Sequence, residues 1–161
     1  MNRTILLVED DVNDVFFFKR AVKLAAIIDP LHVAQDGRQA IDYLKGSGAY
    51  ADRNQFPLPS LVMLDLKLPH VMGLDVLKWI RAQPEFQNVI VIVFTSSQLT
   101  PDIDNAYRLG ANSYVVKPST PGELQEMLVV IKQYWLDLNE LPPGQAAVAR
   151  PPTRIVQSAM L

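Results

Sequence analysis

The chain has 161 residues, of which 49% are apolar and 20% charged, with a net charge of −2. This length favours one domain with a sizeable core, and the balanced charge provides no basic face for nucleic acid. The apolar runs are too short to span a bilayer, and the absence of cysteine excludes disulfides, thiolate metal sites and cysteine nucleophiles. We therefore expect a cytoplasmic protein that binds neither membranes nor nucleic acid.

Short apolar runs alternate with helical patterns along the chain. Strands are expected at residues 5–8, 31–34, 60–66, 88–94 and 112–116, because short runs rich in Val and Ile are typical of buried strands. Helices are expected at residues 12–27, 37–46, 73–83, 101–109 and 121–138. Residues 46–59 carry Gly, Pro and polar side chains and are expected to form an extended loop. This alternation predicts an α/β fold, a parallel sheet with helices on both faces.

The last expected helix carries apolar side chains on two faces. One face follows helical spacing and comprises Leu124, Met127, Leu128, Ile131, Trp135 and Leu138. Val129, Val130 and Leu136 lie away from that stripe, which indicates either a partner surface or the ordinary scatter of exposed apolar residues. Residues 1–138 are expected to form the folded domain, and the Pro-rich residues 139–161 a flexible tail or an extended arm.

Polar side chains stand at the ends of four expected strands. Glu9 and Asp10 follow the first strand, and Asp65 stands near the end of the third. Thr95 follows the fourth strand and Lys117 the fifth. Because ligands bind at the carboxyl ends of the strands in an open parallel sheet, we expect these side chains to meet at one edge.

These residue types suit phosphoryl transfer to a carboxylate. Mg²⁺ prefers oxygen ligands, and Asp10 and Asp65 can supply two of them while Glu9 holds a metal-bound water. Asp65 can then remain an anionic nucleophile, while Lys117 and Thr95 contact the phosphoryl oxygens. Taken singly, each residue also has a structural explanation, because Asp65 and Thr95 can cap neighbouring turns and Lys117 can be a solvated lysine.

Four stretches together resemble the response-regulator receiver domain of two-component signalling. They are LLVEDD (6–11), MLDLKLP (63–69), VFTSS (93–97) and GANSYVVKP (110–118), and the resemblance covers about residues 3–136. It implies a doubly wound, flavodoxin-like five-stranded parallel sheet with strand order 2-1-3-4-5. It also implies a switch rather than an enzyme, one that at most catalyses its own phosphorylation and dephosphorylation.

The resemblance divides the acidic residues into two groups. Asp65 would be the phosphorylated aspartate, and Glu9 with Asp10 would be the acid pair that binds Mg²⁺, for which Mn²⁺ or Ca²⁺ can substitute. Asp11 matches no motif position. Asp11 and Asp14 are expected only to serve the start of the first helix, where acids suit the helix dipole.

The resemblance also assigns roles beyond the acids. The backbone carbonyl of Lys67 would complete the metal ligands, and Lys117 would bind the phosphoryl group, followed by a cis Pro118. Thr95 would be the switch hydroxyl. Tyr114 would be the aromatic side chain that turns inward when Thr95 moves toward the phosphate.

A narrower resemblance is to the single-domain regulators that partner bacterial and cyanobacterial phytochrome histidine kinases. LVEDDVND (7–14), the loop at 46–59 and QYWLDLNELPP (133–143) are similar to that group. This resemblance implies a sensor histidine kinase of the phytochrome type as partner. It also implies a homodimer through the last helix and a C-terminal arm, with Val129, Val130 and Leu136 in the interface.

The sequence thus predicts a stand-alone response regulator that takes a phosphoryl group from a sensor histidine kinase onto Asp65. A phosphorelay intermediate, which passes the group on to a histidine phosphotransfer protein, remains open. A haloacid-dehalogenase-like phosphatase is a remoter alternative, since that family has a second acid two residues after its nucleophile, where this chain has Lys67. A receiver-shaped module that is never phosphorylated tends to lack a key side chain, and none is missing here.

Overall fold

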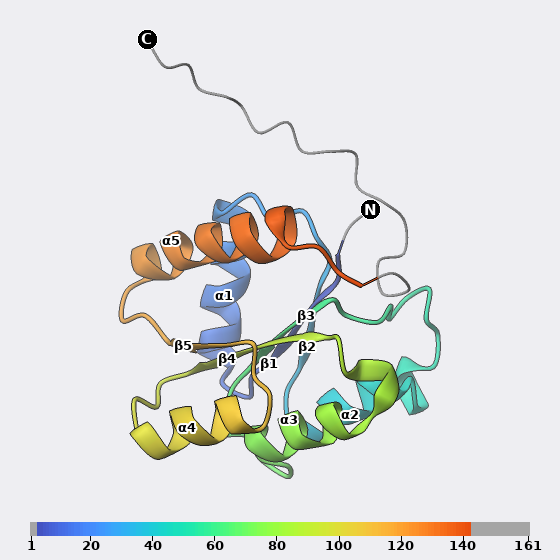
Figure 1. Cartoon of the computed structure of the whole chain (residues 1–161). Coiled ribbons are helices and arrows are strands. Elements are labelled where there is room, and N and C mark those ends of the chain that lie inside the picture. Colours follow the sequence, from blue (N-terminus) through green and yellow to red (C-terminus); the bar gives the residue numbers. More distant parts are fainter. Residues whose placement is uncertain (1–2, 143–161) are drawn as a thin grey trace.

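A five-stranded parallel sheet lies at the centre of residues 3–142, the part of the chain that this computed structural model describes (Figure 1). The strands are β1 (Ile5–Val8), β2 (Leu31–Ala34), β3 (Leu61–Leu64), β4 (Ile90–Thr95) and β5 (Ser113–Val116). Their order in the sheet is β2-β1-β3-β4-β5, and every neighbouring pair is parallel. The expected doubly wound sheet is therefore confirmed.

Helices cover both faces of the sheet. They are α1 (Val12–Leu24), α2 (Gly37–Lys45), α3 (Gly73–Ala82), α4 (Thr100–Arg108) and α5 (Pro121–Ile131), with short 3₁₀ turns η1 (Gly48–Tyr50) and η2 (Pro84–Phe86). Helices α1 and α5 lie on one face, and α2, α3 and α4 on the other (Figure 1). Within residues 3–142, no helix combines the length and the apolarity needed to cross a membrane.

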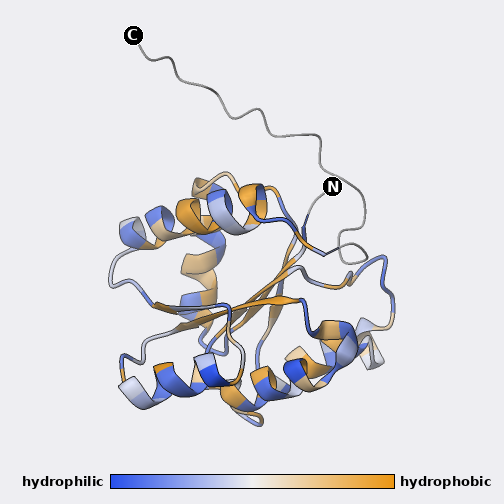
Figure 2. Cartoon of the chain, viewed as in Figure 1, coloured by the Kyte–Doolittle hydropathy of each residue, from blue (hydrophilic) through white to orange (hydrophobic). Residues whose placement is uncertain are grey.

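The strands supply two apolar cores, one on each face of the sheet. Leu7 and Met63 pack with side chains of α1 and α5. Leu6 and Val62 point the other way and pack with side chains of α2 and α3. Figure 2 shows the resulting apolar strands between helices that carry both polar and apolar residues. Burial on both faces explains why the central strands are unbroken apolar runs.

The last helix changes its winding after Ile131. It continues as a π-helix, η3 (Lys132–Leu138), in which backbone hydrogen bonds join residues five apart. Leu136, five residues after Ile131, consequently lies in the core with 1% of its surface exposed, whereas Leu138 is 59% exposed. The expectation that Leu138 faces the core and Leu136 the outer surface is wrong, because it assumed α-helical spacing throughout.

The predicted tail falls mostly outside the described residues. Helix η3 ends at Leu138, and residues 143–161 lie outside the part that the structure describes. The tail or arm at 139–161 therefore stays a prediction.

Three arginines bind main-chain carbonyls at the amino edge of the sheet, where the strands begin. Arg3 donates to the carbonyls of Trp135 and Asn139, at the end of η3. Arg53 donates to carbonyls in the last turn of α2 and in the loop before β3. Arg81 donates to carbonyls in the segments before β4 and β5. These contacts satisfy helix-end and loop carbonyls that the regular elements leave without partners.

Two glycines fix the loop that follows β3. A Cβ atom on Gly73 would lie 2.1 Å from the carbonyl oxygen of Asp65, and one on Gly37 would lie 2.0 Å from the carbonyl oxygen of Val71. The Gly73 N–H also donates to the carbonyl of Leu66, at 2.9 Å. Both ends of this loop are thus packed against backbone, which sets the position of the Asp65 side chain.

Candidate functional site

Three carboxylates meet at the carboxyl edge of the sheet. Glu9 and Asp10 directly follow β1, and Asp65 directly follows β3. Oxygen atoms of the three side chains lie within 4.8 Å of one another. Glu9 is only 2% exposed and Asp65 is also buried, whereas Asp10 is exposed. The strand ends thus bring together the acids that the sequence singled out, in a cluster with a buried floor and an open side.

Backbone N–H groups orient the two buried carboxylates. The N–H of Asp11 donates to Glu9 Oε1 at 3.1 Å, and the N–H of Leu66 donates to Asp65 Oδ1 at 2.7 Å. The other oxygen of each carboxylate, Glu9 Oε2 and Asp65 Oδ2, accepts a hydrogen bond from Lys117. Each carboxylate is therefore held from both sides.

Lys117 is the central cation of the site. Its ammonium donates to Glu9 Oε2 at 2.5 Å, to Asp14 Oδ2 at 2.8 Å and to Asp65 Oδ2 at 3.1 Å. Because a lysine has three N–H donors, these three carboxylates use all of them. The ammonium also lies 5.7 Å from the centre of the Phe94 ring, near the end of β4.

The buried charges shift one another's pKa values. Burial raises the pKa of Glu9 to about 7; the hydrogen bond from Lys117 opposes this shift, and the charge of Asp65 adds to it. Burial lowers the pKa of Lys117, but hydrogen bonds to Asp14 and Glu9 and the charge of Asp65 outweigh it. The pKa of Lys117 therefore lies above its usual value. The two close buried carboxylates favour a further cation, whereas the Lys117 ammonium already neutralises part of their charge.

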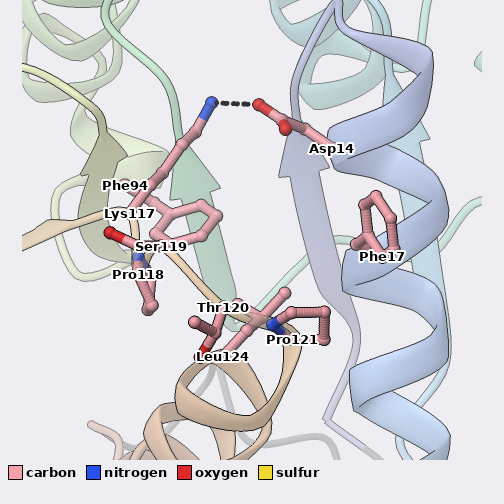
Figure 3. Close-up of a pocket in the computed structure, with 9 residues that line it drawn as sticks. All are labelled: Asp14, Phe17, Phe94, Lys117, Pro118, Ser119, Thr120, Pro121 and Leu124. Atoms are coloured by element: carbon pink, nitrogen blue, oxygen red, sulfur yellow. Dashed lines mark hydrogen bonds and ion pairs between the residues drawn. The ribbon is translucent and has the colours of Figure 1, made fainter.

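The two remaining acids of the N-terminal run differ from each other. Asp11 accepts hydrogen bonds from the N–H groups of Asn13 and Asp14 and so caps α1, which confirms its expected place at the helix start. Asp14 was expected to serve only the helix start, and this is wrong, because its carboxylate binds Lys117 (Figure 3). Its place in the first turn after β1 puts Asp14 near the carboxyl edge, but that place alone does not predict a contact with Lys117.

Thr95 and Tyr114 contact the same loop, between β4 and α4. Thr95 is buried, and its hydroxyl oxygen lies 3.5 Å from the N–H of Ser97. The Tyr114 hydroxyl donates to the carbonyl of Ser97 at 2.9 Å, and the Ser97 hydroxyl donates to the Asp102 carboxylate at the start of α4. Sequence reasoning did not foresee this Ser97–Asp102 contact. Thr95 therefore connects this loop to the carboxylate site, and Tyr114 connects it to β5.

Two expectations concern the backbone near the site. No cis peptide bond occurs in residues 3–142, so the expected cis bond before Pro118 is wrong; the trans form is the intrinsically preferred one for proline. Lys67 lies in the loop after β3 with its side chain exposed. The metal-binding role of its carbonyl stays a prediction.

A family model described as the response regulator receiver domain matches residues 5–129. The chain belongs to this family. Among curated receiver-domain relatives, the probable methanogenesis regulatory protein FilR2 of Methanothrix harundinacea is 35% identical over 141 residues, which cover 86% of each chain. Response regulator Rcp1 of Synechocystis is 33% identical over 140 residues, covering 87% of this chain and 93% of Rcp1.

Solved receiver-domain structures have the same fold, and several of them are response regulators of light signalling. The phosphorylated cyanobacterial phytochrome response regulator RcpA matches with a TM-score of 0.81 and 30% identity, covering 88% of this chain and 99% of RcpA. Response regulator RPA3017, from red light signalling of R. palustris, matches with a TM-score of 0.82 and 31% identity, covering 87% of this chain and 98% of RPA3017. This receiver domain is thus closely related to phytochrome response regulators.

The acid cluster fits the divalent metal that receiver domains bind. Carboxylate oxygens are the ligands that Mg²⁺ and Mn²⁺ prefer, and Glu9, Asp10 and Asp65 present such oxygens within 4.8 Å of one another. The Mn²⁺-bound form of Rcp1 is among the similar structures, with a TM-score of 0.78 and 33% identity, covering 87% of this chain and 99% of Rcp1. Asp10 is exposed, so the cluster is open to water on that side.

Proposed function

We propose that Asp65 accepts the phosphoryl group from a phosphohistidine of a sensor histidine kinase, in a Mg²⁺-dependent reaction. Phosphorylation by a histidine kinase is the function of the receiver-domain family, and members are generally switches rather than enzymes. The observation that supports Asp65 is the Lys117 ammonium, which lies 3.1 Å from Asp65 Oδ2 and also binds the other buried carboxylate of the cluster, Glu9. An ammonium in this position can bind an oxygen of the phosphoryl group once that group is attached to Asp65.

The transfer forms one bond and breaks one. An oxygen of Asp65 bonds to phosphorus while the bond from phosphorus to the donor's imidazole nitrogen breaks, and that nitrogen keeps the electron pair. Lys117 exchanges its contact with Asp65 for one with a phosphoryl oxygen. Asp10, Asp65 and the carbonyl of Lys67 would hold Mg²⁺, with Glu9 acting through a bound water. The metal supplies positive charge to the phosphoryl oxygens, where electrostatics provide most of the catalysis.

The phosphoryl group can change the loop between β4 and α4. Its oxygens on Asp65 would attract the Thr95 hydroxyl, which now lies near the N–H of Ser97. When Thr95 turns, the loop around Ser97 loses that contact, and the hydrogen bond from Tyr114 to the Ser97 carbonyl is strained. Tyr114 is then free to turn inward, so a charge added at the site changes the surface of β4, α4 and β5.

An apolar groove beside the site supports a protein donor. The groove has a volume of about 290 Å³ and shares Asp14 and Lys117 with the site (Figure 3). Its other lining residues come from α1, from the end of β4, from the segment that joins β5 to α5 and from the start of α5: Phe17, Phe94, Pro118, Ser119, Thr120, Pro121 and Leu124. We propose that the kinase covers this groove when its phosphohistidine reaches Asp65. By similarity to RcpA and RPA3017, the kinase would be a phytochrome, and the reaction would take place in the cytoplasm.

Substitution of Asp65 tests the phosphoacceptor. Asp65→Asn should abolish labelling by acetyl phosphate and Mg²⁺, measured as one added phosphoryl group by intact-protein mass spectrometry. Asp11→Asn is the matched control, because it removes a neighbouring charge and keeps a good helix cap, and it should be labelled as the wild type is. Labelling of Asp65→Asn that is as acid-labile and as complete as in the wild type would refute the assignment.

Comparison of two donors tests the groove. Phe17→Ser should slow transfer from an autophosphorylated phytochrome kinase while leaving labelling by acetyl phosphate unchanged, because only the protein donor needs the groove. Tyr107→Ser is the control, because Tyr107 is an exposed aromatic residue on α4 that does not line the groove, and it should change neither rate. Equal slowing with both donors, or no slowing with the kinase, would show that the groove is not the docking surface.

The outer face of the last helix supports a dimer. Val130 is 63% exposed, while Val129 is only partly exposed and packs against the core. Val130 lines a groove of about 360 Å³ together with Tyr134 and Trp135, beside the edge strand β5. We propose that a second copy of the chain covers it. Val130→Glu should then lower the mass measured by sedimentation equilibrium, and an unchanged mass would count against this face.

A phosphorelay intermediate uses the same chemistry and remains the second candidate. It would return the phosphoryl group from Asp65 to a histidine of a phosphotransfer protein. A phosphotransfer protein that removes the group faster than water does would establish the relay. The phosphatase alternative is set aside, because the chain belongs to the receiver family.

A further inference from the structure

Asp14 binds the same lysine as the metal cluster without belonging to the cluster. The Lys117 ammonium has three carboxylate partners, and two of them, Glu9 and Asp65, are also members of the three-acid cluster. The third partner is Asp14, at 2.8 Å, and its oxygens are not among those within 4.8 Å of one another in that cluster. Asp14 is therefore the one partner of Lys117 here that a cation in the cluster would not take.

A divalent cation and the ammonium compete for the same oxygens. Lys117 now neutralises Glu9 and Asp65, so a cation that binds these acids must repel the ammonium or share their oxygens with it. If the ammonium lost both carboxylates and gained no other partner, a partly buried charge would be left uncompensated, which costs free energy. Asp14 offers such a substitute at a position the ammonium already contacts.

The fold holds Asp14 where this exchange needs it. Its N–H donates to the Asp11 side chain, so the first turn of α1 fixes its backbone. Its side chain is 44% exposed, faces the Lys117 ammonium and lines the groove together with Lys117 and Phe94 (Figure 3). Asp14 projects from α1 toward the Lys117 ammonium, and it can hold the ammonium beside the carboxylate cluster (Figure 3).

We propose that Asp14 is a positioning residue that holds the Lys117 ammonium beside Asp65 while Glu9 and Asp65 turn to a divalent cation. This inference rests on the proposed function, in which Lys117 must lie beside Asp65 to bind the phosphoryl group. It adds that cation and lysine occupy the site together only because a fourth carboxylate shares the lysine. Without Asp14, Lys117 returns to Glu9 and Asp65 and competes with the cation.

Titration with Mn²⁺ tests this directly, with free Mn²⁺ followed by electron paramagnetic resonance. Asp14→Asn should weaken Mn²⁺ binding roughly three- to tenfold, the scale of one half-exposed charged contact. Asp11→Asn removes an equal charge from the same helix turn, keeps the cap and makes no contact with Lys117. It therefore measures the loss of long-range attraction alone. An effect of Asp14→Asn no larger than that of Asp11→Asn would overturn the proposal.

A double-mutant cycle shows whether Asp14 acts through the lysine. In a Lys117→Met background, Asp14→Asn should weaken Mn²⁺ binding no more than Asp11→Asn does. If the full three- to tenfold loss persists without the ammonium, Asp14 attracts the cation itself and the proposal is wrong. These affinities need no phosphorylation, so their failure is separate from labelling of Asp65→Asn, which would refute the phosphoacceptor instead.

Discussion

The buried Glu9 should make the metal-free protein lose stability as the pH rises. Glu9 is 2% exposed, and its pKa is raised from 4.5 to about 7, chiefly by burial. The folded chain therefore binds a proton at this site more tightly than the unfolded chain does. Between pH 4.5 and 7 the folded state keeps the proton and the unfolded state has lost it, so the free energy of unfolding falls as the pH increases.

The size of this effect follows from the two pKa values. At about 1.4 kcal/mol per pKa unit, the change from 4.5 to about 7 corresponds to about 3 kcal/mol. The contribution is fully present below pH 4.5 and is lost by the time the pH passes about 7. Glu9→Gln keeps the shape of the side chain but removes this titration.

Urea unfolding of both proteins in EDTA, at several pH values between 4 and 8, measures the difference. The wild type minus Glu9→Gln difference in unfolding free energy should fall by about 3 kcal/mol across this range. Glu85→Gln is the matched control, because Glu85 is exposed to water in the folded and in the unfolded chain. A wild type minus Glu9→Gln difference that stays flat, or that increases with pH, would refute the reasoning.

Three further predictions concern the last helix, the loop after β3 and the metal. Leu136→Ala should cost about 2–5 kcal/mol in urea unfolding and Leu138→Ala less than about 0.5, because only the first is buried; equal costs would contradict the π-helical winding. Gly73→Ala should destabilise the fold by about 1–3 kcal/mol and slow labelling by acetyl phosphate, because a Cβ there meets the carbonyl oxygen of Asp65. Gly122→Ala should do neither, because a Cβ there meets nothing within 4 Å. Mn²⁺ affinity should fall up to about tenfold per pH unit below about 7, where Glu9 is protonated, and a pH-independent affinity would contradict this.

Strand positions and the acid cluster could be predicted because each depends on local pattern. Runs such as Leu61–Leu64 are apolar at every position, and such strands have both faces buried in a parallel sheet. Glu9 and Asp65 then meet because neighbouring parallel strands end at the same edge, whatever the helices do. The topology alone fixes this part of the site.

Other features depend on tertiary packing that no local pattern carries. The π-helical turn places Leu136 in the core by a choice of winding, and the sequence there fits α-helical spacing equally well. The contact between Asp14 and Lys117 joins residues 103 positions apart, and it requires the first turn of α1 to approach the end of β5. Periodicity describes which face of a helix is apolar, but not how close that helix stands to a strand end.

The side-chain contacts at the two edges of the sheet differ in their sensitivity to pH and to bound ions. At the amino edge, Arg3, Arg53 and Arg81 bind backbone carbonyls, and a guanidinium keeps its charge at every pH a cell experiences. At the opposite edge the contacts join ionised side chains, and in the proposed function a cation and a phosphoryl group would rearrange them. Arg3 also joins the first described residues to the end of η3, so both ends of the folded part belong to the unchanging edge. A reporter dye attached there would sense little of the signal, and a useful one belongs on the loop between β4 and α4.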